Sequence, residues 1–138
     1  MKTGRAGRRS GQGLVEFALV FPILIVLLLG VVEVGRAIFA FNTVAEAAKT
    51  AARVAIVNQD LTTIQNAVIN DQRIAWLGLT ATNVPAPTYG CVAPYSIGCI
   101  VTTKVTYQFR PITPIISAVF PAISLSSTSA LPIERVSP

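Results

Sequence analysis

The chain has 138 residues, of which 52% are apolar and only 12% are charged, and its formal net charge is +5. This length provides one small domain, and the apolar fraction is too high for an ordinary soluble one. The sequence contains no histidine and two cysteines, too few ligands for a zinc site. We therefore expect part of the chain to lie in a membrane.

The first segment, residues 1–11, is predicted to be a basic cytoplasmic leader. Lys2, Arg5, Arg8 and Arg9 precede an apolar run with no acid among them, and basic residues beside a membrane span stay in the cytoplasm. A nucleic-acid-binding arm is the alternative, but a short basic arm beside a membrane helix is more often a topology signal. We expect no nucleic-acid partner.

The next segment, residues 14–32, is predicted to be the transmembrane half of a long helix over residues 12–57. It contains the uncharged run FALVFPILIVLLLGVV and spans about 28 Å as a helix, close to the thickness of the bilayer core. A secretory signal peptide has a shorter apolar core and ends at a small-residue cleavage site. Because helical patterning continues past Val32, the pattern favours a single-pass anchor in a lipid bilayer, with the C-terminal part outside.

Residues 33–57 are predicted to be the amphipathic half of the same helix. Apolar residues recur at alternating steps of four and three, which places them on one stripe. Its small side chains suit either a partner helix or a tightly packed sheet. Charged residues lie off the stripe, where Glu33 and Arg36, and Glu46 and Lys49, can pair. The stripe residues are Val34, Ile38, Phe41, Ala45, Ala48, Ala52 and Ala55.

Residues 58–138 are predicted to form a small external head. Asp60 is a credible N-cap for a second helix that ends near Gly78, with Leu61, Ile64, Val68 and Ala75 on one side. Residues 79–99 are rich in proline and glycine and are predicted to form a loop. Cys91 and Cys99 lie in this loop and are expected to form a disulfide outside the cell.

The end of the chain carries strand patterns. Residues 100–110 alternate, with Val101, Val105, Tyr107 and Phe109 on one face, and residues 123–131 form a second strand that can pair with the first antiparallel. Between them, Thr113 and Pro114 open a short apolar helical turn that we expect to pack over the sheet rather than enter the membrane. The fold class is therefore α+β, with a long helix, a shorter helix and a small antiparallel sheet.

Catalytic chemistry is not expected, nor is a cofactor. Beyond the first helix the only acids are Asp60, Asp71 and Glu134, each with an ordinary role as a cap or a solvated charge, and no phosphate loop stands out. The unusual group is Glu16, a carboxylate two residues inside the apolar run. A charge buried in a membrane is a functional candidate, although Glu16 can also reach headgroup water.

The residues around Glu16 resemble a known sequence motif. The sequence GQGLVEFALV, residues 11–20, resembles the processing site of type IV prepilin-like proteins, in particular the TadE-like pseudopilins of the tight-adherence (Tad/Flp) pilus. The tail VTYQFRPITP, residues 105–114, with its following Ser/Thr-rich strand, is also similar to TadE-like proteins. The resemblance implies a type IV pilin-like fold and a prepilin peptidase that cuts after Gly11. Gln12 then becomes the first residue, Glu16 the fifth and Phe17 the sixth; a cut after Gly13 fits worse.

The implied role is a pseudopilin, or minor pilin-like subunit, that assembles with other pilin subunits through its N-terminal helix. After cleavage the new ammonium at Gln12 can pair with Glu16 of a neighbouring helix. The expected assembly residues are Glu16, Pro22, Ile38, Phe41, Ala45, Ala48 and Ala52. The alternatives are an uncleaved single-pass membrane protein with a small external binding domain, and a soluble domain released from a signal peptide.

Overall fold

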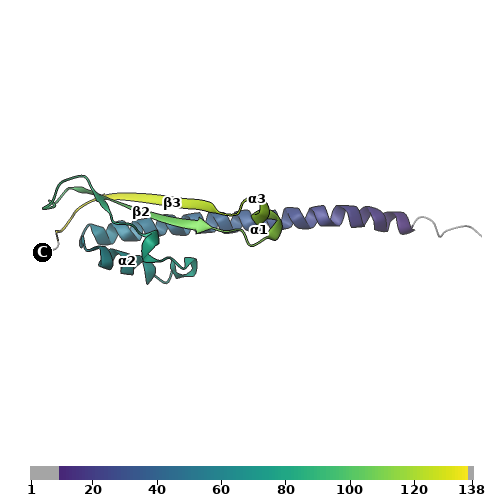
Figure 1. Cartoon of the computed structure of the whole chain (residues 1–138), viewed down its shortest axis with the longest axis horizontal. Coiled ribbons are helices and arrows are strands. Elements are labelled where there is room, and N and C mark those ends of the chain that lie inside the picture. Colours follow the sequence, from purple (N-terminus) through teal and green to yellow (C-terminus); the bar gives the residue numbers. More distant parts are fainter. Residues whose placement is uncertain (1–9, 137–138) are drawn as a thin grey trace, which may run out of the picture.

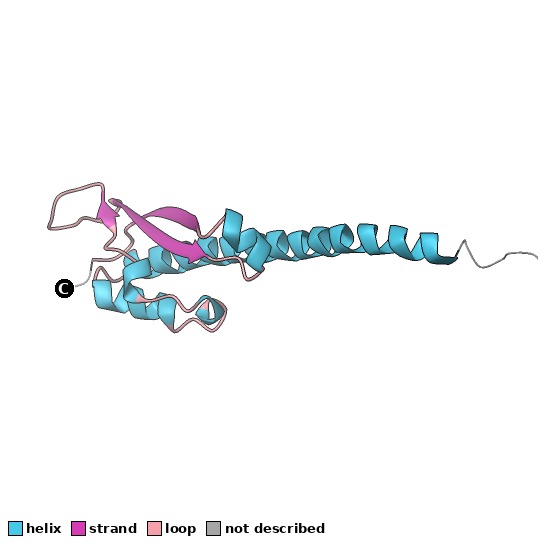
Figure 2. Cartoon of the chain, turned by 45° about the vertical axis from the view of Figure 1, so that its right-hand side comes forward, coloured by secondary structure: helices cyan, strands magenta, loops and turns pink. Residues whose placement is uncertain are grey.

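The computed structural model describes residues 10–136, so most of the basic leader lies outside the described residues. Helix α1 runs from Ser10 to Ala55 and forms the long axis of the molecule (Figure 1). A sheet lies along one side of its C-terminal half and helix α2 along the other (Figures 1 and 2). The architecture is α+β, as the sequence predicts. The other elements are α2 (Leu61–Ile69), η1 (Ala75–Leu77), η2 (Ala81–Asn83), β1 (Thr88–Tyr89), β2 (Ile100–Phe109), α3 (Pro114–Val119) and β3 (Ile123–Pro132).

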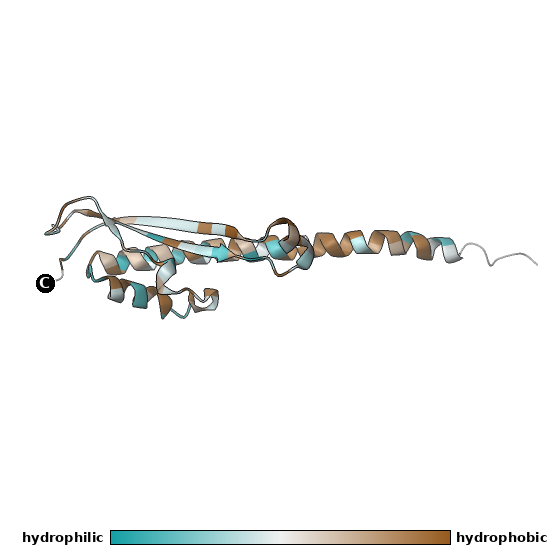
Figure 3. Ribbon diagram, in the orientation of Figure 1, coloured by the Kyte–Doolittle hydropathy of each residue, from teal (hydrophilic) through white to brown (hydrophobic). Residues whose placement is uncertain are grey.

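Helix α1 has two halves with opposite environments. From residue 11 to residue 29 every side chain is exposed, and this half is almost entirely apolar (Figure 3). From Glu33 onward one face is covered by the rest of the chain. The bounds agree with the predicted long helix to within two residues at each end. The helix therefore combines an uncovered apolar rod with the central support of the head.

The covered face of α1 is rotated by about one residue from the predicted stripe. Val34, Ile38 and Phe41 are exposed, whereas the alanines at the C-terminal end of the predicted stripe are buried. Small residues on the covered face let the backbones of α1 and the sheet approach closely. The Thr103 hydroxyl donates a hydrogen bond of 2.9 Å to the carbonyl of Ala48, a residue of the predicted stripe. The fully or almost fully buried residues of this face are Ala40, Val44, Ala47, Ala48, Ala51, Ala52 and Ala55.

The sheet has the order β1-β2-β3 with antiparallel pairing throughout. In β2 the predicted alternation is confirmed: Val101, Val105 and Phe109 are buried, and Lys104 between them is exposed. The predicted pairing of the two long strands is also confirmed, with Val105 opposite Ser127. Strand β1 lies within the predicted loop 79–99 and was not anticipated. Its two residues have too little pattern to distinguish a strand from a turn.

Helix α2 begins as predicted and ends early. The Asp60 carboxylate accepts a hydrogen bond of 2.8 Å from the amide of Thr63, which confirms the N-cap. The predicted end near Gly78 is wrong, because the helix stops at Ile69 and Asp71 starts a separate turn by accepting the Arg73 amide at 3.0 Å. A short polar side chain that binds nearby backbone competes with helix propagation in this way.

The new turn also changes which residue enters the core. Ala75, expected on the buried side of the second helix, is exposed, and Ile74 is buried in its place. Gly78 closes η1 with a left-handed φ of 61°. The chain therefore leaves helix α2 two turns earlier than the apolar spacing indicates.

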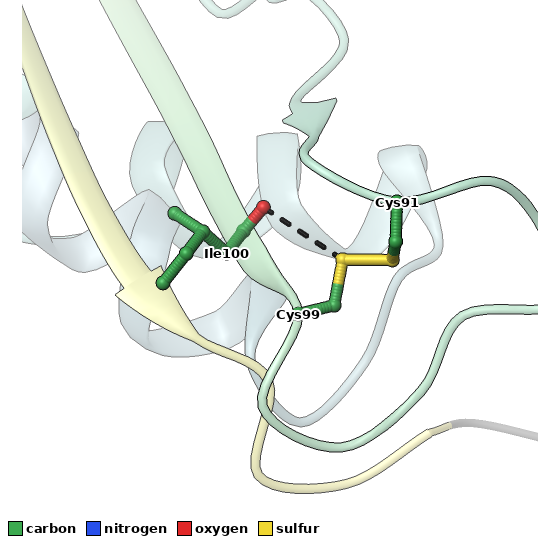
Figure 4. The surroundings of a disulfide bond; sticks show 3 residues. All are labelled: Cys91, Cys99 and Ile100. Atoms are coloured by element: carbon green, nitrogen blue, oxygen red, sulfur yellow. Dashed lines mark hydrogen bonds between the residues drawn. A yellow bond between two sulfur atoms is a disulfide. The ribbon is translucent and has the colours of Figure 1, made fainter.

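Helix α3 and the disulfide lie at opposite ends of the head. Helix α3 begins at Pro114 as predicted, but it lies beside α1 at the end of the sheet, where the uncovered half of α1 begins, rather than over the sheet face (Figure 1). The predicted disulfide is present: Cys91 and Cys99 are joined, with their Cα atoms 6.0 Å apart, just before β2 (Figure 4).

Candidate functional site

The predicted processing residues lie on the first two turns of α1. Gly11, Gln12, Glu16 and Phe17 are all exposed. A side chain built at Gly11 would meet no atom within 4 Å, so this glycine is not required by packing. Glu16 has no hydrogen-bond or ion-pair partner among residues 10–136. The segment is therefore accessible, and its carboxylate is available for a group from another molecule.

The uncovered half of α1 meets the physical requirements of a membrane span. Its most apolar 18-residue window has a mean hydropathy of 2.8, and none of that window is buried. Pro22 lies within the helix and has no N–H, so the carbonyl four residues earlier lacks its usual donor. A helix of this kind is stable where lipid or neighbouring helices cover its side chains. It is a candidate single-pass span.

A second site lies directly above that span, at the carboxylate of Glu33. One of its oxygens accepts hydrogen bonds from the Ile112 amide at 2.7 Å, the Thr113 amide at 2.8 Å and the Thr113 hydroxyl at 3.0 Å. The other oxygen accepts from Arg36 at 2.6 Å, which confirms the predicted Glu33–Arg36 pair. Glu33 thus ties the segment before α3 to α1.

The environment of Glu33 favours its ionised form. Burial raises the pKa of the carboxyl, but hydrogen bonds from Thr113 and Ile112 and the charge of Arg36 together lower the pKa below its ordinary value. The Arg36 guanidinium also lies 5.3 Å from the centre of the Phe109 ring, which holds the cation beside the sheet. Sequence reasoning missed the contact with residues 112–113. The available signal was an acid directly after the span and a Pro-x-Thr-Pro segment in the tail.

The predicted assembly residues are divided by the fold. Ile38 and Phe41 are exposed on α1, and Ala45 is half-buried. Ala48 and Ala52 are fully buried inside the head, where they pack within the same chain. The sequence left open whether the alanines pack on a partner helix or on a sheet. Ala48 and Ala52 pack inside their own head, as expected for a tightly packed sheet. The exposed pair remains available to another subunit.

The predicted pairing of Glu46 with Lys49 is wrong. Glu46 instead lies 3.6 Å from the guanidinium of Arg73, which Asp71 orients through a hydrogen bond of 2.8 Å. The turn after α2 brings this cation next to α1, a long-range effect that spacing within one helix does not reveal. These charges belong to the solvated surface.

Chemistry of a catalytic kind is not apparent in the described part of the chain. Across residues 10–136, no group of three or more His, Cys, Asp or Glu residues is placed to hold a metal ion. The sulfur atoms of Cys91 and Cys99 are both in the disulfide. The distinctive features are the exposed N-terminal turns, the apolar rod and the Glu33 contact.

Comparison with known proteins gives one match. The family model described as TadE-like protein matches residues 11–53, a segment that lies within α1 and includes Gly11, Glu16 and Glu33. Searches of curated proteins and of solved structures gave no match. The resemblance noted around Glu16 is confirmed over this segment. Residues 11–53, the greater part of α1, are therefore similar to TadE-like proteins.

Proposed function

We propose that the chain is a pseudopilin, or minor pilin-like subunit, for assembly of a Tad-type pilus. It is made as a prepilin with the basic leader in the cytoplasm, held in the inner membrane by residues 14–32, and cleaved after Gly11 by a prepilin peptidase. The long helix then joins other pilin subunits, while the head stays outside. No catalysis and no cofactor are part of this role.

The uncovered half of α1 is the observation that carries the proposal. The family match lies in α1, and in the matched segment every side chain of residues 11–29 is exposed. An apolar rod of that length needs lipid before assembly and neighbouring helices afterwards. Pro22 suits this exchange, because a freed carbonyl can be satisfied by groups on an adjacent helix.

Glu16 gives the assembly step its specificity. The carboxylate is exposed on the apolar rod with no partner among the described residues, and an unpaired charge inside a membrane is costly. Cleavage after Gly11 creates an ammonium four residues before it. Pairing of this ammonium with Glu16 of a neighbour removes both unpaired charges and sets the stagger between subunits.

Processing is tested by a matched pair of glycine variants. Both Gly11 and Gly13 have open space around them, so leucine at either position leaves the fold intact. In cells with an active prepilin peptidase, mass spectrometry should show the wild type and Gly13→Leu beginning at Gln12, and Gly11→Leu uncut. A full-length wild-type chain in those cells would refute cleavage and favour an uncleaved membrane protein with an external binding domain.

Assembly is tested separately with Glu16→Gln. The variant should be processed and inserted normally but should be recovered in the pilus fraction far less than wild type. Glu134→Gln, which changes an exposed carboxylate at the far end of the chain, is the control and should assemble normally. Equal recovery of both variants would contradict the role of Glu16. Release of the protein by a carbonate wash would contradict membrane anchoring itself.

A further inference from the structure

The base of the head exposes several large apolar side chains. Ile112 is 74% exposed, Val119 is 67% exposed and Phe120 is 56% exposed, and all three belong to α3 or its flanks. Helix α3 lies beside α1 where the head ends and the uncovered rod begins (Figures 1 and 3). The apolar surface of the rod thus continues onto α3 rather than stopping at the head.

The depth of α3 along α1 is fixed by two contacts. Glu33, one residue past the predicted span, accepts hydrogen bonds from both Ile112 and Thr113 just before α3. An apolar groove of about 360 Å³ lies between α1 and α3, and its walls include Gly30 from within the span and Ile116 from α3. Because Gly30 lies inside the span, a bilayer centred on residues 14–32 reaches the level of α3.

We propose that α3 and its flanks form a membrane-surface contact. The side chains of Ile112, Val119 and Phe120 enter the boundary between headgroups and acyl chains in the leaflet on the side of the head, and a lipid chain occupies the groove between α1 and α3. This inference rests on the membrane-spanning role of residues 14–32 and not on cleavage or pilus assembly.

The chemistry around α3 fits lipid rather than water. Apolar side chains at the boundary of a bilayer gain by leaving water, and an interfacial helix buries its apolar face about 5–10 Å deep. A six-residue helix is too short to bind a membrane alone, but α1 holds it at the surface, so its insertion is intramolecular. A cation that suits a lipid phosphate comes from a neighbouring element, at the exposed Arg110 after β2.

The contact also has a mechanical consequence. A head joined to its span by one continuous helix can tilt as the helix tilts, whereas a second contact beside that helix resists tilting. Glu33 links the two by tying the inserted segment to α1. The head is therefore held at a defined height and orientation above the bilayer until the helix leaves the lipid.

Fluorescence quenching in vesicles tests the contact. Because the native cysteines are joined, a single added cysteine in the full chain is the only free thiol. An environment-sensitive fluorophore is attached to Val119→Cys, to Leu24→Cys in the span and to Thr128→Cys on the exposed face of β3. The proteins are reconstituted in phosphatidylcholine and phosphatidylglycerol vesicles that carry nitroxides near the headgroup or at the chain end, and iodide probes exposure to water.

The expected pattern is distinct for each position. The label at Val119 should lose most of its emission to the shallow nitroxide and little to iodide, the label at Leu24 should be quenched by the deep nitroxide, and the label at Thr128 should respond to iodide alone. Quenching of Val119 by iodide alone, with Leu24 still quenched by lipid, would overturn the contact. If the label at Leu24 were not quenched by the deep nitroxide, the membrane span itself, on which the proposed contact rests, would be overturned.

A second copy of the chain is the competing occupant of this surface. If the apolar helix of another subunit covered α3, the label at Val119 would be shielded from both quenchers, and the shielding would increase with the protein-to-lipid ratio. That result would overturn the assignment to lipid. Lipid quenching that is independent of protein density would support it.

Discussion

The Glu33 contact makes the sharpest prediction, because one carboxylate serves three backbone or hydroxyl donors and one cation. Glu33→Ala leaves the amides of Ile112 and Thr113 without an acceptor. Hydrogen bonds to a charged group contribute about 1.5–3 kcal/mol each, and water near the surface recovers part of the loss, so we expect a cost of about 3 kcal/mol. Glu33→Gln keeps an acceptor for the amides but replaces the oxygen that accepts from Arg36 with an NH2 donor. It therefore loses the hydrogen bond and the attraction to a half-exposed Arg36, about 1 kcal/mol.

Two measurements on the full chain in detergent micelles separate the loss of the acceptor for residues 112–113 from the loss of the interaction with Arg36. Urea unfolding can be followed by Trp76, the only tryptophan, whose ring stacks on Phe39 with centroids 4.8 Å apart. Amide hydrogen exchange reports directly on residues 112–113. Glu33→Ala should lower the urea midpoint more than Glu33→Gln and should abolish protection at these amides. Unchanged exchange in Glu33→Ala would refute the view that Glu33 holds this segment.

The same contact predicts a dependence on pH. The pKa of Glu33 is lowered from its ordinary value of 4.5 in the folded chain, so its stabilising contribution is complete above that value. The contribution is lost as the pH falls through the lower folded pKa. Wild-type stability should therefore decrease below about pH 4.5, and Glu33→Gln should show a smaller decrease over the same range. Identical pH profiles would contradict the ionised state of Glu33.

Three further variants test the packing of the head. Ala51→Leu should overpack the fully buried face of α1 and cost about 1–3 kcal/mol, seen as a lower melting temperature; an unchanged value would argue against close packing there. Thr103→Val should remove the hydrogen bond to the Ala48 carbonyl and cost about 1 kcal/mol in urea unfolding, and a stabilised variant would show that this bond is not needed. Cys91→Ser should open the disulfide loop, cost about 2–3 kcal/mol and make the loop cleavable by protease, whereas equal resistance would show that the disulfide is dispensable.

Most of the fold could be predicted from local pattern. The alternation in β2, the cap at Asp60 and the proline that opens α3 each depend on a few neighbouring residues, and the structure confirms all three. The end of α2 was missed because apolar residues continue at helical spacing past Ile69, while the turn at Asp71 depends on hydrogen bonds that spacing does not reveal.

In the candidate site, too, some residues could be identified from sequence, whereas the long-range contacts could not. Glu16 could be singled out from sequence because it is a carboxylate inside an apolar run, and Gly11 because residues 11–20 resemble a prepilin processing site; the structure leaves both exposed. The Glu33 contact joins residues separated by 79 and 80 positions, so nothing adjacent to Glu33 indicates its partners. Pairing of Glu46 with Arg73 was missed for the same reason.

The sequence by itself determined that α1 is long and that its first half is left uncovered, because an uncharged apolar run of that length has no complementary surface elsewhere in a small chain. Only the tertiary structure decided which face of the second half is buried. Alanine occurs on adjacent stripes of that half, and both accept a close backbone equally well. The choice between them was made by long-range packing, in which the sheet and α2 cover the face that includes Ala40, Val44, Ala47 and Ala51, and by the contact of Glu33 with residues 112–113.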